Sequence, residues 1–419
     1  MHSLTVTRRR FLTLSGAAAC GLLAQYRGLA CPILENPETM KEAKGLAIAI
    51  NTFASDLYTQ LAKDDKGTLL FSPFSISTAL AMTSAGAKVQ TLDEMQKVLH
   101  LPTNPHSGFH ELLTHLNATG LDKDRGYELT AANALWAMKD YPWRKQFLHL
   151  TQKHYGAGVM ETDFGMPEVA RQRINEWVEK ETRERIKDLI PAGAIDTLTR
   201  MVLTNAIYFK GDWASTFDEK RTRNASFTRI DGTKAEVPLM AQTGEFGYGE
   251  FTASFDRKPN RVQVLDLPYV GNELSMRVYL SADIRVVEKL PEMIAKDDLG
   301  PIILRPKQVQ ISLPRFKAES EFSLAPILVD LGMKAAFGKA DFSGMYSGTE
   351  HLSITAVLHK AFVEVNEKGT EAAAATAVII GRMSAPLVTE FRADRPFLFT
   401  IRDNKTGTVL FMGRYNGPR

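Results

Sequence analysis

The residues most informative about function lie near the C-terminal end of the chain. Arg382-Met383-Ser384 follows a short apolar run, Val378 to Ile380. Upstream, residues 367–376 read Glu-Lys-Gly-Thr-Glu-Ala-Ala-Ala-Ala-Thr, and no proline occurs from Glu367 to Ala385. Such a segment could be exposed in one state and become a central strand in another.

Two local structures compete for this segment. Helix propensity favours an alanine-rich turn over Ala372 to Ala375 with Thr370 as its N-cap. A strand entering a packed sheet needs every backbone donor, alternating faces and little bulk at its leading end. One alternate set meets these needs because none of its members is charged and the first four are small: Thr370, Ala372, Ala374, Thr376, Val378 and Ile380. Gly369 supplies a hinge that tolerates unusual backbone angles.

Catalysis by the chain itself is poorly supported. His110 and His115 are five residues apart, about 140° around a helix, whereas a zinc-protease motif needs histidines four apart. The run 344–348 places its serine one position too late for a nucleophile elbow. His359 could act as a base, but a hydrogen-bonded core histidine is the simpler interpretation. We therefore expect no enzyme, although a triad assembled only in space is not visible in one sequence.

The elements that must position these residues follow from periodicity. Apolar residues from Leu46 to Leu61 form a helical stripe, and a nearly continuous apolar run over 201–209 predicts a strand buried on both faces. Helices and strands mix along the chain, which indicates an α+β fold. The other expected elements are strands over 68–71 and 309–316, helices over 75–86, 91–119 (in two pieces) and 174–190 (Trp177 and Ile186 inward), and a hairpin of 397–402 with 408–413.

Several motifs together resemble the serpin family. The segment 367–376 is similar to the hinge of an inhibitory serpin's reactive loop. The other matching runs, in family order from about Lys44 to Pro418, are Ser72-Pro73-Phe74-Ser75-Ile76-Ser77, Asn205 to Trp213, Leu267-Pro268-Tyr269, Leu313 to Phe316, Asp341 to Gly344, His359-Lys360-Ala361, Arg395-Pro396-Phe397 and Phe411 to Arg414. Each run is weak alone, but their order and spacing make the resemblance specific.

The resemblance implies a serpin fold of three β-sheets and eight or nine helices, with an exposed reactive loop over 367–390. It implies an irreversible suicide-substrate inhibitor of serine endopeptidases, with cross-class inhibition of cysteine proteases as an extension. The cleaved loop would insert into the main sheet through its hinge, which comprises Glu367, Lys368, Gly369, Thr370, Glu371, Ala372, Ala373, Ala374, Ala375 and Thr376. A non-inhibitory serpin, acting as a binding or chaperone-like protein, is the alternative.

By the same resemblance, four polar residues form the shutter, where strands part to admit the loop: Ser72, Ser75, Asn205 and His359. Trp213 matches the breach, where insertion begins. Thr68 stands where many serpins have asparagine, so the shutter could differ in detail. Counting seventeen residues from Glu367 places the reactive bond at Met383-Ser384, which suits chymotrypsin-, elastase- or subtilisin-like proteases. Arg382-Met383 is the alternative bond and suits trypsin-like enzymes.

The N-terminus predicts export. Arg8-Arg9-Arg10 precedes an apolar stretch that ends near Ala24, as in a twin-arginine signal peptide over 1–30. We assign 31–43 to a linker and 44–418 to the serpin domain, and we expect a periplasmic or extracellular protein. Cys31 would head the mature chain, so tethering through it stays open. Cys20 and Cys31 are the only cysteines, which excludes a disulfide framework in the body.

Charge and composition limit the partners. The net charge of the chain is +3, but four of its 51 bases lie in the leader. Without them, 47 bases face 48 acids and the net charge becomes −1. We therefore expect no nucleic-acid partner, no stable membrane span, no cofactor and no metal. The expected state is a monomer whose partner is a serine protease held in a covalent acyl complex. Neither the target protease nor any activator can be named from the sequence.

Overall fold

The computed structural model describes residues 37–64, 66–120, 126–156, 159–295, 302–348, 352–370 and 388–418. The predicted signal peptide, Cys31 and the reactive bond at Met383 lie outside these residues, as do hinge residues 371–376. The body from Glu38 onward forms one compact unit. Its first helix, α1 (Pro37–Asp64), begins within the 31–43 stretch that the sequence assigned to a linker.

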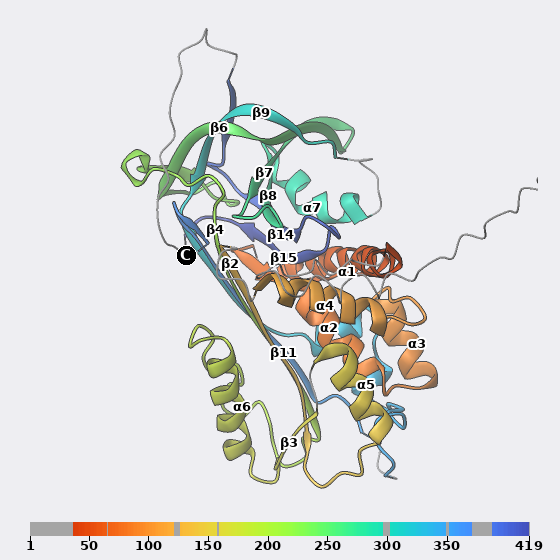
Figure 1. Ribbon diagram of the computed structural model, residues 1–419. Helices are drawn as coiled ribbons and strands as arrows, with labels where there is room; N and C mark the ends of the chain where they lie inside the picture. Colours follow the sequence, from red (N-terminus) through yellow and green to blue (C-terminus); the bar gives the residue numbers. More distant parts are fainter. Residues whose placement is uncertain are drawn as a thin grey trace, which may run out of the picture. The chain divides into compact units, whose positions relative to one another are not determined.

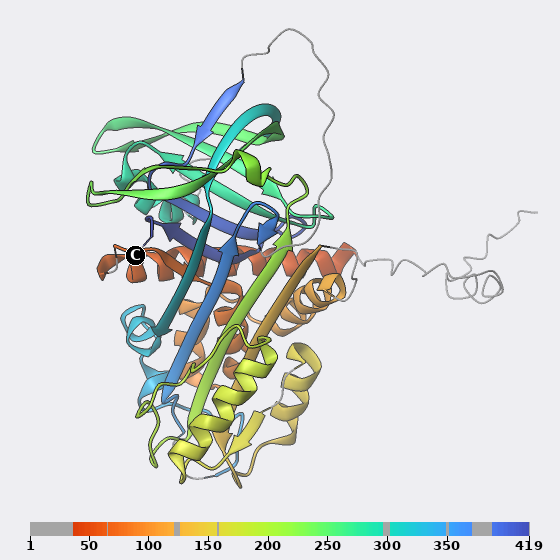
Figure 2. The ribbon, with the colours of Figure 1, turned by 90° about the vertical axis from the view of Figure 1, so that its left-hand side faces the viewer.

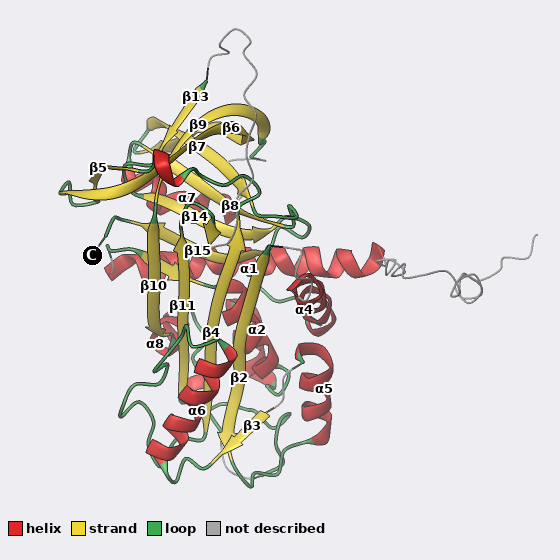
Figure 3. Ribbon diagram, turned by 60° about the vertical axis from the view of Figure 1, so that its left-hand side comes forward, coloured by secondary structure: helices red, strands yellow, loops and turns green. Residues whose placement is uncertain are grey.

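A six-stranded sheet dominates one half of this unit (Figure 3). Its strand order is β10-β11-β4-β2-β3, and β12 pairs with β4 alone. β4 and β11 are parallel, with Asn205 opposite His359. The strands are β2 (Tyr127–Met138), β3 (Val159–Thr162), β4 (Met201–Asp212), β10 (Phe316–Ser323), β11 (Ala356–Val365) and β12 (Gly369–Thr370).

β4 is buried on both faces, as its apolar run predicts. Val202 and Ala206 join a core with α6 (Pro167–Glu181), whereas Leu203 and Ile207 join the core on the other face. This alternation follows the two-residue period of a strand. Figure 1 shows α6 on one side of the sheet and, on the other, α2 (Pro73–Ser84), α4 (His106–Gly120) and α5 (Lys145–Tyr155).

The second sheet has nine strands, with a main order of β1-β15-β14-β8-β7-β6-β9-β13 (Figure 2). The long strand β6 (Lys234–Phe255) pairs with β5, β7 and β9 in turn. Strand β6 therefore joins these strands into one continuous sheet, whereas the resemblance implied two separate sheets in this part of the molecule. The other strands are β1 (Leu69–Phe71), β5 (Arg223–Thr228), β7 (Lys258–Pro268), β8 (Leu274–Ser281), β9 (Arg305–Pro314), β13 (Thr389–Arg392), β14 (Phe397–Asp403) and β15 (Val409–Tyr415).

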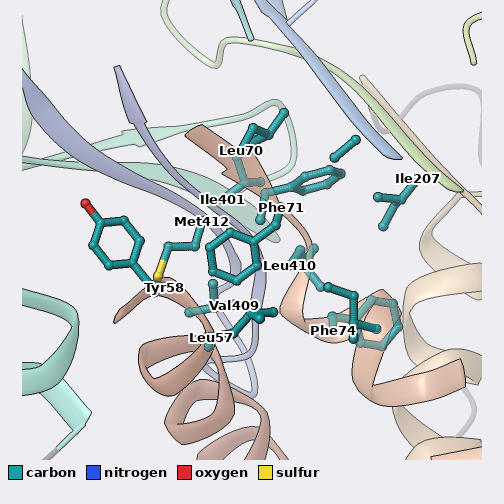
Figure 4. Packing of buried hydrophobic residues seen from close by; sticks show 14 of the residues in the cluster. Leu57, Tyr58, Leu70, Phe71, Phe74, Ile207, Ile401, Val409, Leu410 and Met412 are labelled. Atoms are coloured by element: carbon teal, nitrogen blue, oxygen red, sulfur yellow. The ribbon is translucent and has the colours of Figure 1, made fainter. Parts of the chain in front are cut away.

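The main apolar core lies where α1 meets β1 and the predicted C-terminal hairpin, β14 with β15. Leu57 of α1, Phe71 of β1 and Leu410 of β15 are fully buried and share this cluster (Figure 4). Burying such a side chain stabilises the fold by about 1.5–3 kcal/mol. The start of α2 is packed close by, through Phe74 (Figure 4).

One predicted helix differs from the structure. The sequence predicted a helix over 174–190, but α6 ends at Glu181. Arg183 and Glu184 adopt left-handed backbone angles, and the hydroxyl of Thr182 accepts a hydrogen bond from Ile186 N. Ile186 is buried as predicted, although it lies in the irregular segment after the helix, because burial alone does not distinguish the two conformations.

The prediction of an α+β fold is confirmed, and the described residues contain eight α-helices. Those not yet introduced are α3 (Val89–Val98), α7 (Ile284–Ala295) and α8 (Ala325–Asp330), and two short 3-10 helices span Glu219–Arg221 and Ala335–Phe337. The two-piece prediction for 91–119 matches α3 and α4. None of the described helices combines the length and hydrophobicity needed to cross a bilayer.

Candidate functional site

The first residues of the predicted hinge lie at the end of the β4–β11 pair. The chain leaves β11, turns through Asn366 and Gly369, and returns as β12. β12 runs antiparallel to β4, with Gly369 opposite Asp212 and Thr370 opposite Gly211. A continuation of β12 in the same direction would therefore run along β4, toward the contact line between β4 and β11.

The close approach of β12 to β4 depends on glycine. A Cβ atom at position 369 would lie 2.1 Å from Gly211 O and 2.5 Å from Asp212 Cα. Backbone atoms cannot yield to such contacts as a flexible side chain can. Gly211 itself is tightly enclosed, because a Cβ there would lie 2.8 Å from the rings of Phe209 and Tyr269. The sequence predicted Gly369 as a hinge, and the structure adds that its missing side chain lets two strands meet.

Glu367 anchors the base of the hinge. Its residue is only 4% exposed, and its carboxylate accepts a 2.7 Å hydrogen bond from the Thr222 hydroxyl. Arg315 approaches the same oxygen at 3.6 Å, and Phe217 N donates to the Glu367 carbonyl at 2.7 Å. A buried carboxylate needs such partners, because an unpaired buried charge is costly. These contacts fix where the hinge begins.

Trp213 holds the same turn from the end of β4. Its Nε1 donates to Asn366 O at 3.0 Å, and its backbone N donates to Lys368 O at 2.9 Å. The indole stacks on the ring of Tyr269, with centroids 4.6 Å apart and planes 13° apart. Trp213, which the resemblance assigns to the breach, therefore directly contacts the turn that leads into the predicted hinge.

Deeper in the sheet, three side chains form a closed ring of hydrogen bonds, and a fourth, His359, bonds one of them. The amide Nδ2 of Asn205 donates to Ser75 Oγ at 2.7 Å and to Asn133 Oδ1 at 2.6 Å. Ser75 Oγ donates to Asn133 Oδ1 at 2.8 Å, and His359 Nδ1 bonds to Asn205 Oδ1. These residues come from α2, β2, β4 and β11, so the network joins three strands to the helix behind them.

Ser72 extends this network toward the C-terminal hairpin. Its backbone N donates to His359 Nε2 at 3.1 Å, and its hydroxyl donates to Leu410 O at 2.6 Å. The same hydroxyl caps α2 by accepting from Ser75 N. Pro73 at the first helical position has no N–H to satisfy, which suits this cap. The four predicted shutter residues are thus brought into one connected cluster.

The bonds of His359 define its protonation. Because Nε2 accepts from a backbone N–H, Nδ1 must carry the proton and donate to Asn205. A second proton on Nε2 would face the Ser72 donor. Complete burial lowers the pKa of His359 to about 3. The imidazole is therefore a neutral structural group at physiological pH, in agreement with the core interpretation rather than with a catalytic base.

The network contains one residue that the sequence analysis did not name, Asn133. Asn133 was not singled out, because residues 131–138 show neither a regular alternation nor a continuous run of large apolar residues that would indicate a strand. Thr68 lies apart from the network, since its hydroxyl donates to Gly417 O at 3.2 Å and accepts from Asn416 N at 3.1 Å. The network thus contains two asparagines, Asn205 of β4 and Asn133 of β2, and neither occupies the position of Thr68.

Comparisons with known proteins agree with this architecture. Residues 48–418 match the family model described as "Serpin (serine protease inhibitor)". An uncharacterized serpin-like protein of Thermococcus kodakarensis is 41% identical over 91% of this chain and 88% of its own length. Human leukocyte elastase inhibitor is 39% identical over 89% of this chain and 99% of its own length.

The fold agrees as well. The crystal structure of native protease nexin-1 with heparin superposes with a TM-score of 0.78 at 32% identity, covering 90% of this chain and all of that one. A family model that covers most of the chain, together with relatives of this identity, settles the family. The chain belongs to the serpins.

Proposed function

We propose that this protein is a suicide-substrate inhibitor of serine endopeptidases. The nucleophile of the target protease attacks the bait carbonyl and forms an acyl-enzyme. Cleavage frees the hinge side of the loop, which enters the six-stranded sheet as a new strand between β11 and β4. Insertion carries the tethered protease away before water can complete hydrolysis. Inhibition is therefore a race that insertion must win.

The observation that carries the proposal is the placement of β12. Gly369 and Thr370 already pair with Asp212 and Gly211 in the antiparallel sense that a fully inserted strand requires. The residues that would follow carry only small or apolar side chains at alternate positions, as the sequence shows from Ala372 to Ile380. Each further residue would add backbone hydrogen bonds to the sheet, which is how added strands gain their stability.

The bait lies outside the described residues, so its assignment rests on the sequence. We propose Met383-Ser384 as the reactive bond, with chymotrypsin-, elastase- or subtilisin-like enzymes as targets. The similarity to leukocyte elastase inhibitor supports this class. Use of Arg382-Met383 would direct the inhibitor to trypsin-like enzymes. Cysteine proteases form an acyl-enzyme as well, and the same trap extends to them.

The test mixes the protein with chymotrypsin, elastase, subtilisin and trypsin in separate reactions. A complex that survives denaturing electrophoresis, with a released fragment that starts at Ser384, is the expected result. A fragment that starts at Met383 would move the target to trypsin-like enzymes. Clean cleavage without any complex would contradict the inhibitory proposal and favour a non-inhibitory serpin. Hydrolysis of peptides without added protease would instead reveal an enzyme.

A further inference from the structure

A cavity of about 400 Å³ lies beside the outer edge of β2, away from the hinge and the breach. β3 pairs with β2 only over residues 135–138, at one end of the strand (Figure 3). Beside residues 129–134, β2 has no strand on that side among the described parts of the chain. α2, α4 and the end of α5 line the cavity from one face of the sheet, and α6 lines it from the other. The cavity therefore occupies the place where the sheet lacks a strand.

The walls of the cavity suit a small apolar molecule. Its volume lies in the range of sites that hold small molecules, about 300–1,000 Å³. Glu181 is the only charged residue among the described residues that line it, and it is exposed to solvent. An uncharged ligand therefore fits these walls better than an anion. The large or methyl-bearing side chains that α2, α4 and β3 contribute are Phe74, Ala79, Met82, Leu113, Leu116 and Met160.

The direction of the shutter hydrogen bonds leaves one donor beside this cavity. Ser72 N donates to His359 Nε2, so His359 Nδ1 donates to Asn205 Oδ1, and the Asn205 amide must in turn donate to Asn133. Asn133 therefore turns its oxygen toward the network, where it also accepts from Ser75 Oγ. Its Nδ2 donates to no acceptor within the described structure, and Asn133 is one of the residues that line the cavity.

Two other polar groups on the wall are already bonded. The Thr78 hydroxyl donates to Phe74 O at 2.7 Å, and the Tyr155 hydroxyl lies 2.7 Å from His106 Nδ1. An amide donor that faces a mostly apolar cavity without an acceptor is costly, because it has lost its hydrogen bonds to water. A ligand with an acceptor near Asn133 would recover that bond.

We propose that this cavity binds a small uncharged organic molecule whose carbonyl oxygen accepts a hydrogen bond from Asn133 Nδ2. The apolar body of the molecule packs against the side chains of α2 and α4. The ligand becomes the last acceptor in the chain of hydrogen bonds that starts at Ser72 N, so it connects directly to the shutter. Binding to the folded state stabilises that state. The inference does not depend on the proposed protease inhibition.

Benzophenone and diphenylmethane are the probes that test this site. Both have two phenyl rings, but only benzophenone has a carbonyl oxygen. We expect both to raise the Tm of the intact protein. Calorimetry should show that benzophenone binds about threefold tighter or more, the gain expected from one added hydrogen bond.

Benzophenone also reports where it binds. On irradiation its excited carbonyl takes a hydrogen atom from a nearby C–H bond, and the two carbon radicals then join. Peptide mapping should find this label on Met82 or Met160, which lie on different walls of the cavity. Labelling should saturate as the probe concentration rises.

Three variants sharpen the test. Ala131→Phe obstructs the open side of the cavity, since Ala131 lines it and is exposed. It should abolish the labelling and the rise in Tm. Ala235→Phe makes the same change on β6, outside the cavity, and should bind both probes like the parent protein. Asn133→Asp keeps an oxygen for Ser75 and Asn205 but lacks the N–H₂ group, so it should bind the two probes equally.

Several outcomes would overturn the proposal. Labels confined to residues outside the cavity, or undiminished labelling of Ala131→Phe, would show that the probe binds elsewhere. Equal binding of the two probes by the parent protein would show that Asn133 donates to neither. Absence of saturable binding would mean that water alone satisfies the amide. If Asn133→Asp fails to fold, Ala131→Phe still decides whether the site exists. No protease enters this experiment, so failure here leaves the proposed inhibitory function untouched.

Discussion

The breach and the shutter hold the same two strands, β4 and β11, by different means. At the breach, two backbone donors hold the hinge turn beside its side-chain partners: Trp213 N bonds Lys368 O, and Phe217 N bonds Glu367 O. At the shutter, buried side chains bond one another, with Asn205 and His359 at the centre. Backbone bonds can be exchanged for those of an entering strand. Side-chain bonds are lost when strands part unless the network moves as a unit. Under the proposed insertion mechanism, we therefore expect the breach to permit entry and the shutter to resist it.

The largest expected effect on the yield of protease complex comes from a charged side chain at Thr370, the first hinge residue that would enter the sheet. Thr370→Arg places a positive charge at the leading end of the strand that would enter the sheet, at the position opposite Gly211. An unpaired buried charge costs several kcal/mol, and every 1.4 kcal/mol slows a step about tenfold. We expect cleavage without a stable complex. Densitometry of denaturing gels measures the partition between complex and cleaved product.

Thr370→Ser is the control for that change, because it keeps a small uncharged side chain. It should form complex as the parent protein does. If Thr370→Arg also forms a full yield of complex, entry of the hinge at the breach is not the step that traps the protease.

Acid should destabilise the folded protein through the buried shutter histidine. An unfolded histidine has a pKa near 6.5, whereas His359 in the folded protein has a pKa of about 3. Between these values the unfolded chain binds the extra proton, so stability is complete above pH 6.5 and declines as the pH falls. The contribution is about 1.4 kcal/mol per pH unit, or about 3 kcal/mol at pH 4. Denaturant unfolding from pH 7 to pH 4 measures it.

Two variants separate the sources of this pH dependence. His359→Gln should lower stability at pH 7 but flatten the decline toward pH 4. His106→Gln should also flatten the decline, since the pKa of His106 is lowered to about 4, but over a narrower range. A decline of the same slope in His359→Gln would show that the shutter histidine is not what acid titrates.

Two serines on α2 differ in whether their hydroxyl groups form hydrogen bonds. Ser75 Oγ bonds both Asn205 and Asn133, whereas Ser77 Oγ is buried with no partner among the described residues. Ser75→Ala leaves two buried amides short of a partner and should cost about 1–3 kcal/mol of unfolding free energy. Ser77→Ala removes only an unsatisfied group and should be neutral or stabilising. Equal losses from the two changes, seen by urea denaturation, would mean that packing rather than bonding sets the cost.

The sequence marks the polar network more clearly than the partners of the hinge turn, for a physical reason. Ser72 and Ser75 share one short motif, and Asn205 and His359 each sit in an apolar strand where a polar residue is conspicuous. Glu367 was placed in the hinge, but its partners Phe217 and Thr222 lie about 150 residues earlier in irregular chain. No local pattern marks such residues, because their role comes from where the fold brings them.

The predictions of secondary structure likewise succeeded for some elements and failed for others. Met201 to Phe209 was predicted as a central strand because continuous apolar character reports burial on both faces. The strand that contains Asn133 was missed, although it pairs with β4 along most of its length. The helix predicted over 174–190 was too long at its end, since Ile186 is buried by tertiary packing outside any helix. Burial patterns thus predicted which residues face the core, but not always the backbone conformation that takes them there.

The smallest expected effect on stability comes from removing the indole N–H of Trp213, and Trp143 serves as the comparison. Trp213 Nε1 donates to Asn366 O at the breach, whereas Trp143 Nε1 is buried with no partner among the described residues. Trp213→Phe keeps an aromatic ring for stacking on Tyr269 and removes one hydrogen bond, so it should cost about 1 kcal/mol. Trp143→Phe also shortens an indole to a phenyl ring but loses no bond. The difference in Tm between the two variants isolates the bond to the hinge turn.

If the bond matters for entry, Trp213→Phe will also change the yield of protease complex, while Trp143→Phe will not. A change in Tm alone would mean that the indole N–H secures the turn without controlling insertion, and the backbone bonds of Trp213 and Phe217 would then be what hold the breach.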